Sequence, residues 1–195
     1  MTENTTLRSV KRWLWREPKS SLQNADTFTR LYEQTYLIVF RYVYGLCAGS
    51  RQEAEDLTAE TYARAWRQRQ HFNGDERAAV GWLLRIARNL AIDASRRRKV
   101  RDVDESANVE LLLDPQIAPE VDIIAREQIA LLWQMLGALA SDVREMMVLR
   151  YMLGWQVRQM ASYLGINENT ISVTIRRTLK SLQRDWPQSQ EKDNE

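Results

Sequence analysis

The segment Met160-Ala-Ser-Tyr-Leu-Gly-Ile-Asn-Glu-Asn-Thr-Ile-Ser-Val-Thr-Ile-Arg-Arg-Thr-Leu-Lys180 predicts a helix-turn-helix. Ala161 is small enough for two helices to pack closely, and Gly165 suits the positive φ of a tight turn. After the turn, apolar residues recur at helical spacing, and they are Ile171, Ile175, Leu179 and Leu182. The spacing therefore predicts a second helix that packs through this stripe.

The opposite face of the second helix is polar and basic. It carries Asn169, Ser172, Thr174, Arg176, Arg177 and Lys180. Side chains of these types hydrogen-bond base edges and neutralise phosphates when a helix lies in the major groove of DNA. A plain helical hairpin with a solvated polar face would show the same pattern, so this alternative stays open on the motif alone.

The composition predicts an all-α protein. Only seven glycines and four prolines occur in 195 residues, and Ala, Leu, Arg, Glu and Gln are abundant. No apolar run approaches the roughly 18 residues of a membrane-spanning helix, so we expect no membrane insertion. The single Cys47 and the single His71 offer neither a disulfide nor a zinc cluster. We therefore expect a cytoplasmic protein with no metal and no other cofactor.

The net charge of +2 conceals a segregation of charge along the chain. Residues 26–101 hold fourteen basic and nine acidic side chains, net +5, and residues 125–187 hold eight and five, net +3. Residues 102–124 hold seven acidic and no basic side chains, net −7. Two basic blocks joined by an acidic connector indicate two modules that bind polyanions.

These patterns divide the chain into two small helical domains joined by a flexible acidic linker. We expect an N-terminal extension over residues 1–25, a first domain over 26–99, the linker over 100–124, a second domain over 125–187 and a polar tail over 188–195. Four helices are expected in the first domain.

Local signals predict where the helices begin. Asp26 or Thr27 is expected to cap the first helix. Ser50 is expected to cap the second, in a capping box with Glu53. In the second domain, Ser141 is the expected cap.

The second helix of the first domain carries an acidic face. Glu53, Asp56 and Glu60 lie at spacings of three and four residues, which puts them on one side of the helix. One interpretation is a solvated face in which Glu60 pairs with Arg64 and Arg67. On the pattern alone this interpretation is favoured over a docking surface for a basic partner.

A basic stripe follows on a later helix of the same domain. Arg85, Arg88, Asn89 and Arg96 recur at helical spacing, opposite an apolar stripe of Leu83, Ile86 and Leu90. Such a stripe favours phosphate contacts, and Asn is suited to reading base edges. The aromatic residues Trp66, Phe72 and Trp82 nearby are able to stack on unpaired bases, although we expect both tryptophans to be core residues.

Two blocks of this domain resemble a known family. Glu53-Ala-Glu-Asp-Leu-Thr-Ala-Glu-Thr-Tyr-Ala-Arg-Ala-Trp66, followed by Trp82-Leu-Leu-Arg-Ile-Ala-Arg-Asn-Leu-Ala-Ile-Asp93, is similar to the second conserved region of extracytoplasmic-function sigma factors of bacterial RNA polymerase. The helix-turn-helix resembles their fourth region, and the acidic connector takes the place of their linker. The likeness covers about residues 26–185.

The resemblance implies a non-catalytic subunit that directs promoter-specific initiation and aids promoter melting. Its implied partners are core RNA polymerase (the β and β′ subunits), double-stranded and melted promoter DNA, and an anti-sigma factor. The residues implied in docking on the polymerase are Glu53, Asp56, Leu57 and Glu60.

The resemblance also implies two sets of DNA-binding residues. Those for the −10 element are His71, Phe72, Asn73, Trp82, Arg85, Arg88, Asn89, Arg96 and Arg97, and a loop from His71 to Gly81 would capture a flipped base. Those for the −35 element are Glu168, Asn169, Thr170, Ser172, Val173, Arg176, Arg177 and Lys180.

Two other classes of protein are weighed against this one. A sigma mimic that only sequesters an anti-sigma factor should lack the DNA-facing residues, yet Arg88, Asn89, Arg176 and Arg177 are present. A recombinase or nuclease would need a nucleophile or paired carboxylates in a cleft, with a metal in the second case. Glu55 and Asp56 are adjacent and diverge on a helix, so they form no such pair.

Overall fold

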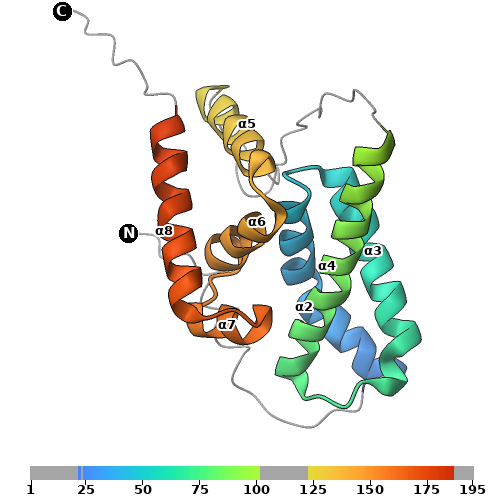
Figure 1. The fold of residues 1–195 in the computed structure, drawn as a ribbon. Helices are drawn as coiled ribbons and strands as arrows, with labels where there is room; N and C mark the ends of the chain where they lie inside the picture. The colour runs from blue at the N-terminus through green and yellow to red at the C-terminus, as the bar shows by residue number, and fades with distance from the viewer. Residues whose placement is uncertain (1–21, 23, 102–122, 187–195) are drawn as a thin grey trace, which may run out of the picture.

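A computed structural model describes residues 22, 24–101 and 123–186 of the chain, and this part contains helices and no strands (Figure 1). The expected all-α fold is therefore confirmed. The greater part of the N-terminal extension and of the linker, and the whole polar tail, lie outside the described residues. The elements, in chain order, are α2 (Ala25–Leu46), α3 (Arg51–Gln68), the 3₁₀ turn η1 (Arg69–His71), α4 (Glu76–Arg101), α5 (Ile123–Ala138), α6 (Ser141–Met147), the π-helical turn η2 (Val148–Met152), α7 (Val157–Leu164) and α8 (Glu168–Asp185).

Helices α2, α3 and α4 pack on one another, and we call them the N-terminal module. Their apolar positions recur every three to four residues, so each helix turns one face inward. The fully buried side chains include Val39, Leu83 and Leu84. Burial of each such side chain contributes roughly 1.5–3 kcal/mol. Inside this core the Thr35 hydroxyl donates to the carbonyl oxygen of Leu31 and lies 2.9 Å from the Tyr62 hydroxyl.

The prediction of four helices in this module was wrong, because three α-helices and the short turn η1 are present. The expected loop from His71 to Gly81 is also shorter, since α4 already begins at Glu76. The cause is local: Asp75 Oδ1 accepts a hydrogen bond from the backbone N–H of Ala78 at 2.8 Å. This contact satisfies a donor of the first helical turn, and the following alanines favour helix.

Three predicted caps need correction. Asn24, rather than Asp26 or Thr27, caps α2, and its side chain accepts from the N–H of Asp26. Ser50 does occupy the N-cap position of α3, but its side chain makes no capping hydrogen bond, so the box with Glu53 is not formed. Helix α6 begins one residue earlier than expected, with Ala140 at its N-cap. Before α2 the cap-forming residues Asn24, Asp26 and Thr27 lie close together, and the path of the chain selects among them.

Helices α5 to α8 follow, and we call them the C-terminal module. The predicted helix-turn-helix is confirmed as α7 and α8, joined at Gly165, whose φ is 69°. Asn167 caps α8 by accepting from the N–H of Asn169. Ile171 and Ile175 are buried as expected, but Leu179 is 40 % exposed.

Thr178 takes the buried position in place of Leu179. The helices that cover α8 are α6 and α7. Their packing direction, rather than the hydrophobicity of the sequence, decides which side of α8 is buried at this level.

The two modules pack against each other along α2, which contacts α6 and η2 (Figure 1). Gly45 makes this approach possible, because a Cβ atom there would lie 2.5 Å from Val148 Cγ2 and 2.8 Å from Met152 Sδ. Tyr44 meets the edge of Trp133 of α5 at a centroid distance of 4.8 Å. The interface therefore has an apolar part at the C-terminal end of α2.

Arg144 of α6 ties this end of α2 to the C-terminal module. Its guanidinium donates to the carbonyl oxygens of Leu136 at 2.9 Å, Leu139 at 3.1 Å and Leu46 at 2.8 Å, and also to that of Gly137. The last carbonyls of a helix have no partner within the helix, so a planar cation is well suited to satisfy those of α2 and α5 together.

We predict that Arg144→Ala lowers the free energy of unfolding by ~3 kcal/mol, because hydrogen bonds to charged groups contribute about 1.5–3 kcal/mol each and are not additive. The melting temperature should fall by about 6–12 °C for a chain of this size. Thermal unfolding followed by circular dichroism measures the change. Arg150→Ala is the matched control, since Arg150 is exposed and donates to one carbonyl, that of Trp155. Equal losses for the two variants would contradict the role of Arg144.

Candidate nucleic-acid interface

The acidic face of α3 lies on the surface of the N-terminal module. Asp56 is exposed, and Glu53 and Glu60 are half-buried. Glu60 Oε1 accepts from Arg64 Nε at 2.8 Å and from an Arg67 nitrogen at 3.2 Å, which confirms the predicted ion pairs. The hydrogen bond from Arg64 is the main cause of the lowered pKa of Glu60.

Leu57 does not belong to this face. It is only 8 % exposed and lies in the core with Ala54 and Thr61. Its expected place among the docking residues stays a prediction, and its burial leaves little of the side chain for a partner to contact.

Two aromatic rings lie together where η1 passes into α4. Phe72 is stacked on Trp82 with a centroid distance of 4.8 Å and an interplanar angle of 28°. His71 and Asn73 on either side of Phe72 are exposed, and both rings are partly buried. The stacked pair is thus fixed by packing, while its neighbours in the loop reach solvent.

Of the two tryptophans expected in the core, Trp82 is partly buried and packs against it, whereas Trp66 lies at the surface. Trp66 is 37 % exposed. The Trp66 ring packs against Phe28 in a T-shaped arrangement, with 5.1 Å between the ring centroids. The guanidinium carbon of Arg69 lies 3.4 Å from the centroid of the Trp66 ring. A cation over an indole face is a stable surface arrangement, which accounts for the exposed position.

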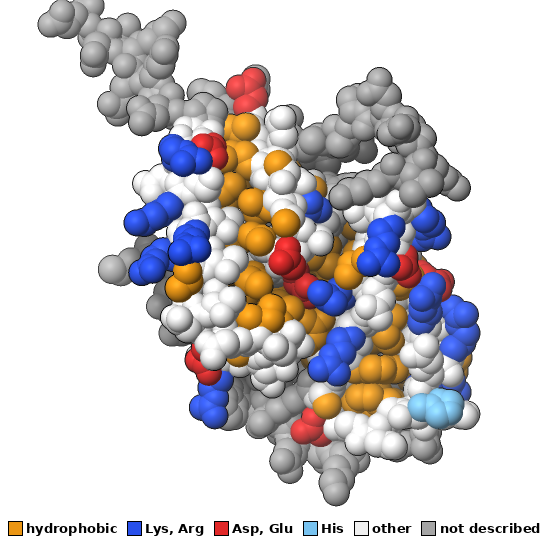
Figure 2. Space-filling view, in the orientation of Figure 1, with side chains coloured by type: hydrophobic (Ala, Val, Ile, Leu, Met, Phe, Trp, Pro, Cys, Tyr) orange, Lys and Arg blue, Asp and Glu red, His pale blue; other side chains and the backbone are white. Residues whose placement is uncertain are grey.

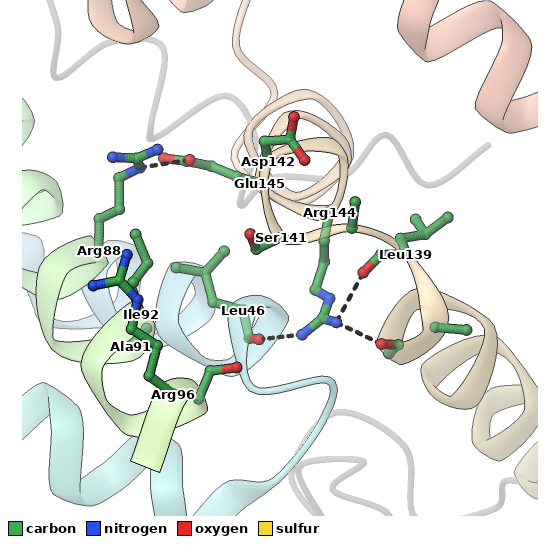
Figure 3. Close-up of a pocket in the computed structure, with 14 residues that line it drawn as sticks. Leu46, Arg88, Ala91, Ile92, Arg96, Leu139, Ser141, Asp142, Arg144 and Glu145 are labelled. Atoms are coloured by element: carbon green, nitrogen blue, oxygen red, sulfur yellow. Dashed lines mark hydrogen bonds and ion pairs between the residues drawn. The ribbon is translucent and has the colours of Figure 1, made fainter. Parts of the chain in front are cut away.

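The basic stripe of α4 is formed as predicted. Arg85, Asn89, Arg96 and Arg97 are exposed, whereas Leu83 and Leu90 on the other side are buried. Arg88 differs from the rest of the stripe. Its Nε donates to Glu145 Oε2 at 2.7 Å, and Glu145 belongs to α6 of the other module (Figure 3).

Glu145 is the centre of a polar cluster between the modules. The residue is 2 % exposed, and its Oε1 accepts from the Tyr42 hydroxyl of α2 at 2.6 Å. The Tyr163 hydroxyl of α7 lies 3.4 Å from that of Tyr42. We call Tyr42, Arg88, Glu145 and Tyr163 the junction cluster.

The electrostatics of the junction cluster favour a neutral tyrosine pair around one ion pair. Burial, followed by the proximity of Tyr163 and Glu145, raises the pKa of Tyr42 well above its ordinary value. Burial is also the main reason that the pKa of Tyr163 rises to about 12. The hydrogen bond to Glu145 raises the pKa of Arg88, so this guanidinium stays charged.

Two crevices run along the junction of the modules. One, of about 630 Å³, lies between α4 and the α5–α6 corner and is lined by residues that include Arg88, Arg96 and Arg144 (Figure 3). The other, of about 700 Å³, lies between the start of α4 and α7. Its walls include Phe72, Trp82 and Arg85 on one side and Trp155, Arg158 and Tyr163 on the other. The aromatic pair and part of the basic stripe therefore face the C-terminal module.

The polar face of α8 is open to solvent. The exposed residues are Glu168, Asn169, Thr170, Ser172, Arg176, Arg177 and Lys180, and Val173 is half-buried among them. Figure 2 shows basic side chains over α8 on one side of the molecule and over α3 and α4 on the other, and between them hydrophobic patches interrupted by a few acidic and basic side chains. The expected −10 and −35 residues thus form two separate surfaces.

Sequence reasoning missed Glu145, Tyr42 and Tyr163. The signal that was available is the position of one carboxylate in the apolar run Glu145-Met-Met-Val-Leu149. Among the described residues, no group of three potential metal ligands is close enough to hold an ion. Within the same ranges, every helix is too short or too polar to cross a bilayer.

Comparisons with known proteins agree with this arrangement. Residues 31–101 match the family model for sigma-70 region 2, and residues 129–182 match that for sigma-70 region 4. The first match coincides with most of the N-terminal module, and the second with most of the C-terminal module.

Two structures share the fold. The sigma factor RpoE of Bartonella quintana, solved with the anti-sigma factor NepR, has a TM-score of 0.62 at 22 % identity, over 82 % of this chain and 96 % of that one. CnrH, solved with the cytosolic domain of CnrY, has a TM-score of 0.57 at 18 % identity, over 93 % of this chain and 99 % of CnrH.

Relatives by sequence include three extracytoplasmic-function (ECF) RNA polymerase sigma factors. BldN of Streptomyces coelicolor is 32 % identical over 84 % of this chain, which spans 61 % of the length of BldN. SigL of Mycobacterium tuberculosis is 29 % identical over 78 % of this chain and 84 % of its own length. SigX of Bacillus subtilis is 26 % identical over 82 % of this chain and 83 % of its own length. With both sigma-70 regions present in order on the two modules, the chain belongs to the sigma-70 family as an ECF sigma factor.

Proposed function

We propose that this sigma factor binds core RNA polymerase, directs it to promoters with its own −35 and −10 elements, and helps to melt the DNA. The observation that carries the proposal is the pair of separate DNA-type surfaces, one on α4 and one on α8, in the order of sigma regions 2 and 4. In this role the chain catalyses no reaction of its own.

Helix α8 is suited to the −35 element. Its capped N-terminal turn presents Asn169 and Thr170 to solvent, and these side chains are able to reach base edges in the major groove. Arg176, Arg177 and Lys180 follow along the same helix and are exposed, as phosphate contacts require. Ile171 and Ile175 anchor the opposite face, so the reading face is held rigidly.

The start of α4 is suited to the melted −10 element. Flipping a base costs a few kcal/mol, which a fitted pocket with aromatic contacts offsets. The Phe72–Trp82 stack lies beside the exposed His71 and Asn73 and at the edge of the 700 Å³ crevice. Asn89 then reads a base edge, and Arg85, Arg96 and Arg97 neutralise the DNA backbone.

The acidic face of α3 is suited to docking on the polymerase. Asp56 is exposed, and Glu53 and Glu60 are partly accessible on the same side of the helix. A partner that binds this face would replace the surface ion pairs of Glu60 with ion pairs across the interface. The loss of free energy is small, because exposed ion pairs contribute little to stability. The proposed partner surface is the clamp of the β′ subunit.

An anti-sigma factor is the proposed regulatory partner. RpoE was solved with the anti-sigma factor NepR, and CnrH with the cytosolic domain of CnrY. The hydrophobic patches between the two basic surfaces here offer a place for such a partner (Figure 2). The chain would then act in the cytoplasm and on the nucleoid when it is bound to polymerase.

Run-off transcription with purified core polymerase tests the proposed function. Discrete transcripts are expected only when the chain is added, and Asp56→Arg should weaken core binding about tenfold or more, because it places a cation against a basic partner. Glu127→Arg is the matched control, since this carboxylate is exposed on α5 of the other module. The absence of both transcripts and core binding would refute the proposal, and equal core affinity for the two variants would remove Asp56 from the docking surface.

Asn89→Ala should cost about 1–3 kcal/mol of discrimination at one −10 base, because a base-edge contact is lost. Transcription from a set of promoters with single substitutions in the −10 element measures this loss. Arg96→Ala is the comparison, since loss of a phosphate contact should weaken all promoters alike and reduce the salt dependence of binding. If Asn89→Ala also weakened all promoters alike, Asn89 would not read a base.

A further inference from the structure

One residue proposed to bind the −10 element is already engaged within the chain. Arg88 is 39 % exposed at its side chain, and its Nε donates to a carboxylate of α6 that is 3 % exposed. The other side of that carboxylate accepts from Tyr42 of α2. Both modules therefore contribute charged or polar groups to one buried contact.

From this geometry we infer that the free chain closes on itself, with the junction cluster and the apolar contacts of α2 holding the two modules together. Closure engages Arg88 in the ion pair with Glu145 and places the Phe72–Trp82 stack opposite α7, across the 700 Å³ crevice. The face of α8 stays open in the same state. The chain would thus have to open before region 2 engages melted DNA; this consequence rests on the proposed function, whereas closure itself does not.

The apolar half of the contact explains why the modules fit so closely. Gly45 lets α2 approach Val148 and Met152 without an intervening side chain. Tyr44 and Trp133 cover the same end of α2. Separation would expose this surface to water, and it would also hydrate Glu145 and release Arg88.

Two substitutions probe the two halves separately. Glu145→Gln keeps the shape of the side chain but removes the ion pair with Arg88. Gly45→Ala adds one methyl group within 2.9 Å of three side-chain atoms of Val148 and Met152, so one of the neighbours has to move. Because alanine favours helix more than glycine does, the second variant should strengthen α2 while it wedges the modules apart.

Each substitution has a matched control. Gly81→Ala makes the same exchange inside α4, where the nearest neighbour of the added atom, Tyr163 Cδ2, lies 4.0 Å away. Glu55→Gln removes a carboxylate that pairs with Arg51 on the exposed surface of α3. These controls reproduce the changes in helix propensity and net charge without touching the contacts of Gly45 or the Arg88–Glu145 ion pair. At Gly81 the added atom reaches only ordinary van der Waals distance from Tyr163 across the 700 Å³ crevice.

The experiment measures the distance between modules in the full free chain by electron-electron resonance. Spin labels are attached at Ala63→Cys on α3 and Gln183→Cys on α8, both exposed positions, with the buried Cys47 replaced by alanine. A distance distribution dominated by one narrow peak is expected for the parent chain and for both controls. Longer and broader distributions are expected for Glu145→Gln and Gly45→Ala. A broad parent distribution, or junction variants that stay as narrow as their controls, would overturn closure.

Binding of the free chain to a fluorescent melted −10 strand gives the second readout. Opening should raise its affinity about tenfold if about a tenth of the parent chain is open, since the apparent Kd is the intrinsic Kd divided by the open fraction. An opened variant whose affinity equals that of the parent would refute the masking of region 2. The distance measurement contains neither polymerase nor DNA, so its outcome is independent of the run-off assay that tests the proposed function.

Discussion

The buried carboxylate of Glu145 is the constraint on which the relative position of the two modules depends. A charge removed from water is costly unless paired and hydrogen-bonded. Here Arg88 of α4 and Tyr42 of α2 supply the two hydrogen bonds, at 2.7 and 2.6 Å. Because these partners come from different helices of the N-terminal module, the contact fixes α6 in both position and orientation. A purely apolar contact would allow more sliding.

Other features of the structure follow from this placement. With α6 held against α2, Arg144 reaches the carbonyl oxygen of Leu46, and the π-helical turn η2 lies over Gly45. Helix α7 then faces the start of α4, and the ring centroid of Tyr163 of α7 lies 5.8 Å from the guanidinium carbon of Arg85 of α4. The Tyr163 hydroxyl also lies beside that of Tyr42 of α2. Helix α8 packs on α6 and α7 and keeps its basic face outward. The two proposed DNA surfaces therefore differ in accessibility within one conformation.

Much of the fold could be predicted from local sequence. Gly165 and the pair Ile171 and Ile175 determine the helix-turn-helix, since a positive φ and a helical apolar spacing are local properties. The polar stripe on α4 was predicted for the same reason. Helix ends were less accurate, as at Asn24, because several neighbouring side chains are able to cap and small differences in the chain path decide between them.

The contacts between distant parts of the chain could not be predicted from the sequence. Arg88 and Glu145 are 57 residues apart, and Tyr42 and Glu145 are 103 apart, so no periodicity links them. Leu57 and Leu179 show that helical spacing alone also does not decide which side chains are buried. Each lies at a helical position that suits its expected role, yet the direction of the neighbouring helices buries the first and exposes the second.

A double-mutant cycle between Arg88→Ala and Glu145→Gln, followed by chemical denaturation of the full chain, tests the central claim most directly. Residues in direct contact show coupling energies of about 0.5–3 kcal/mol, and the partial exposure of Arg88 places the expected value at about 1–2 kcal/mol. A coupling of this size would show that the contact between the modules stabilises the chain in solution. Additive effects of the two substitutions would contradict it.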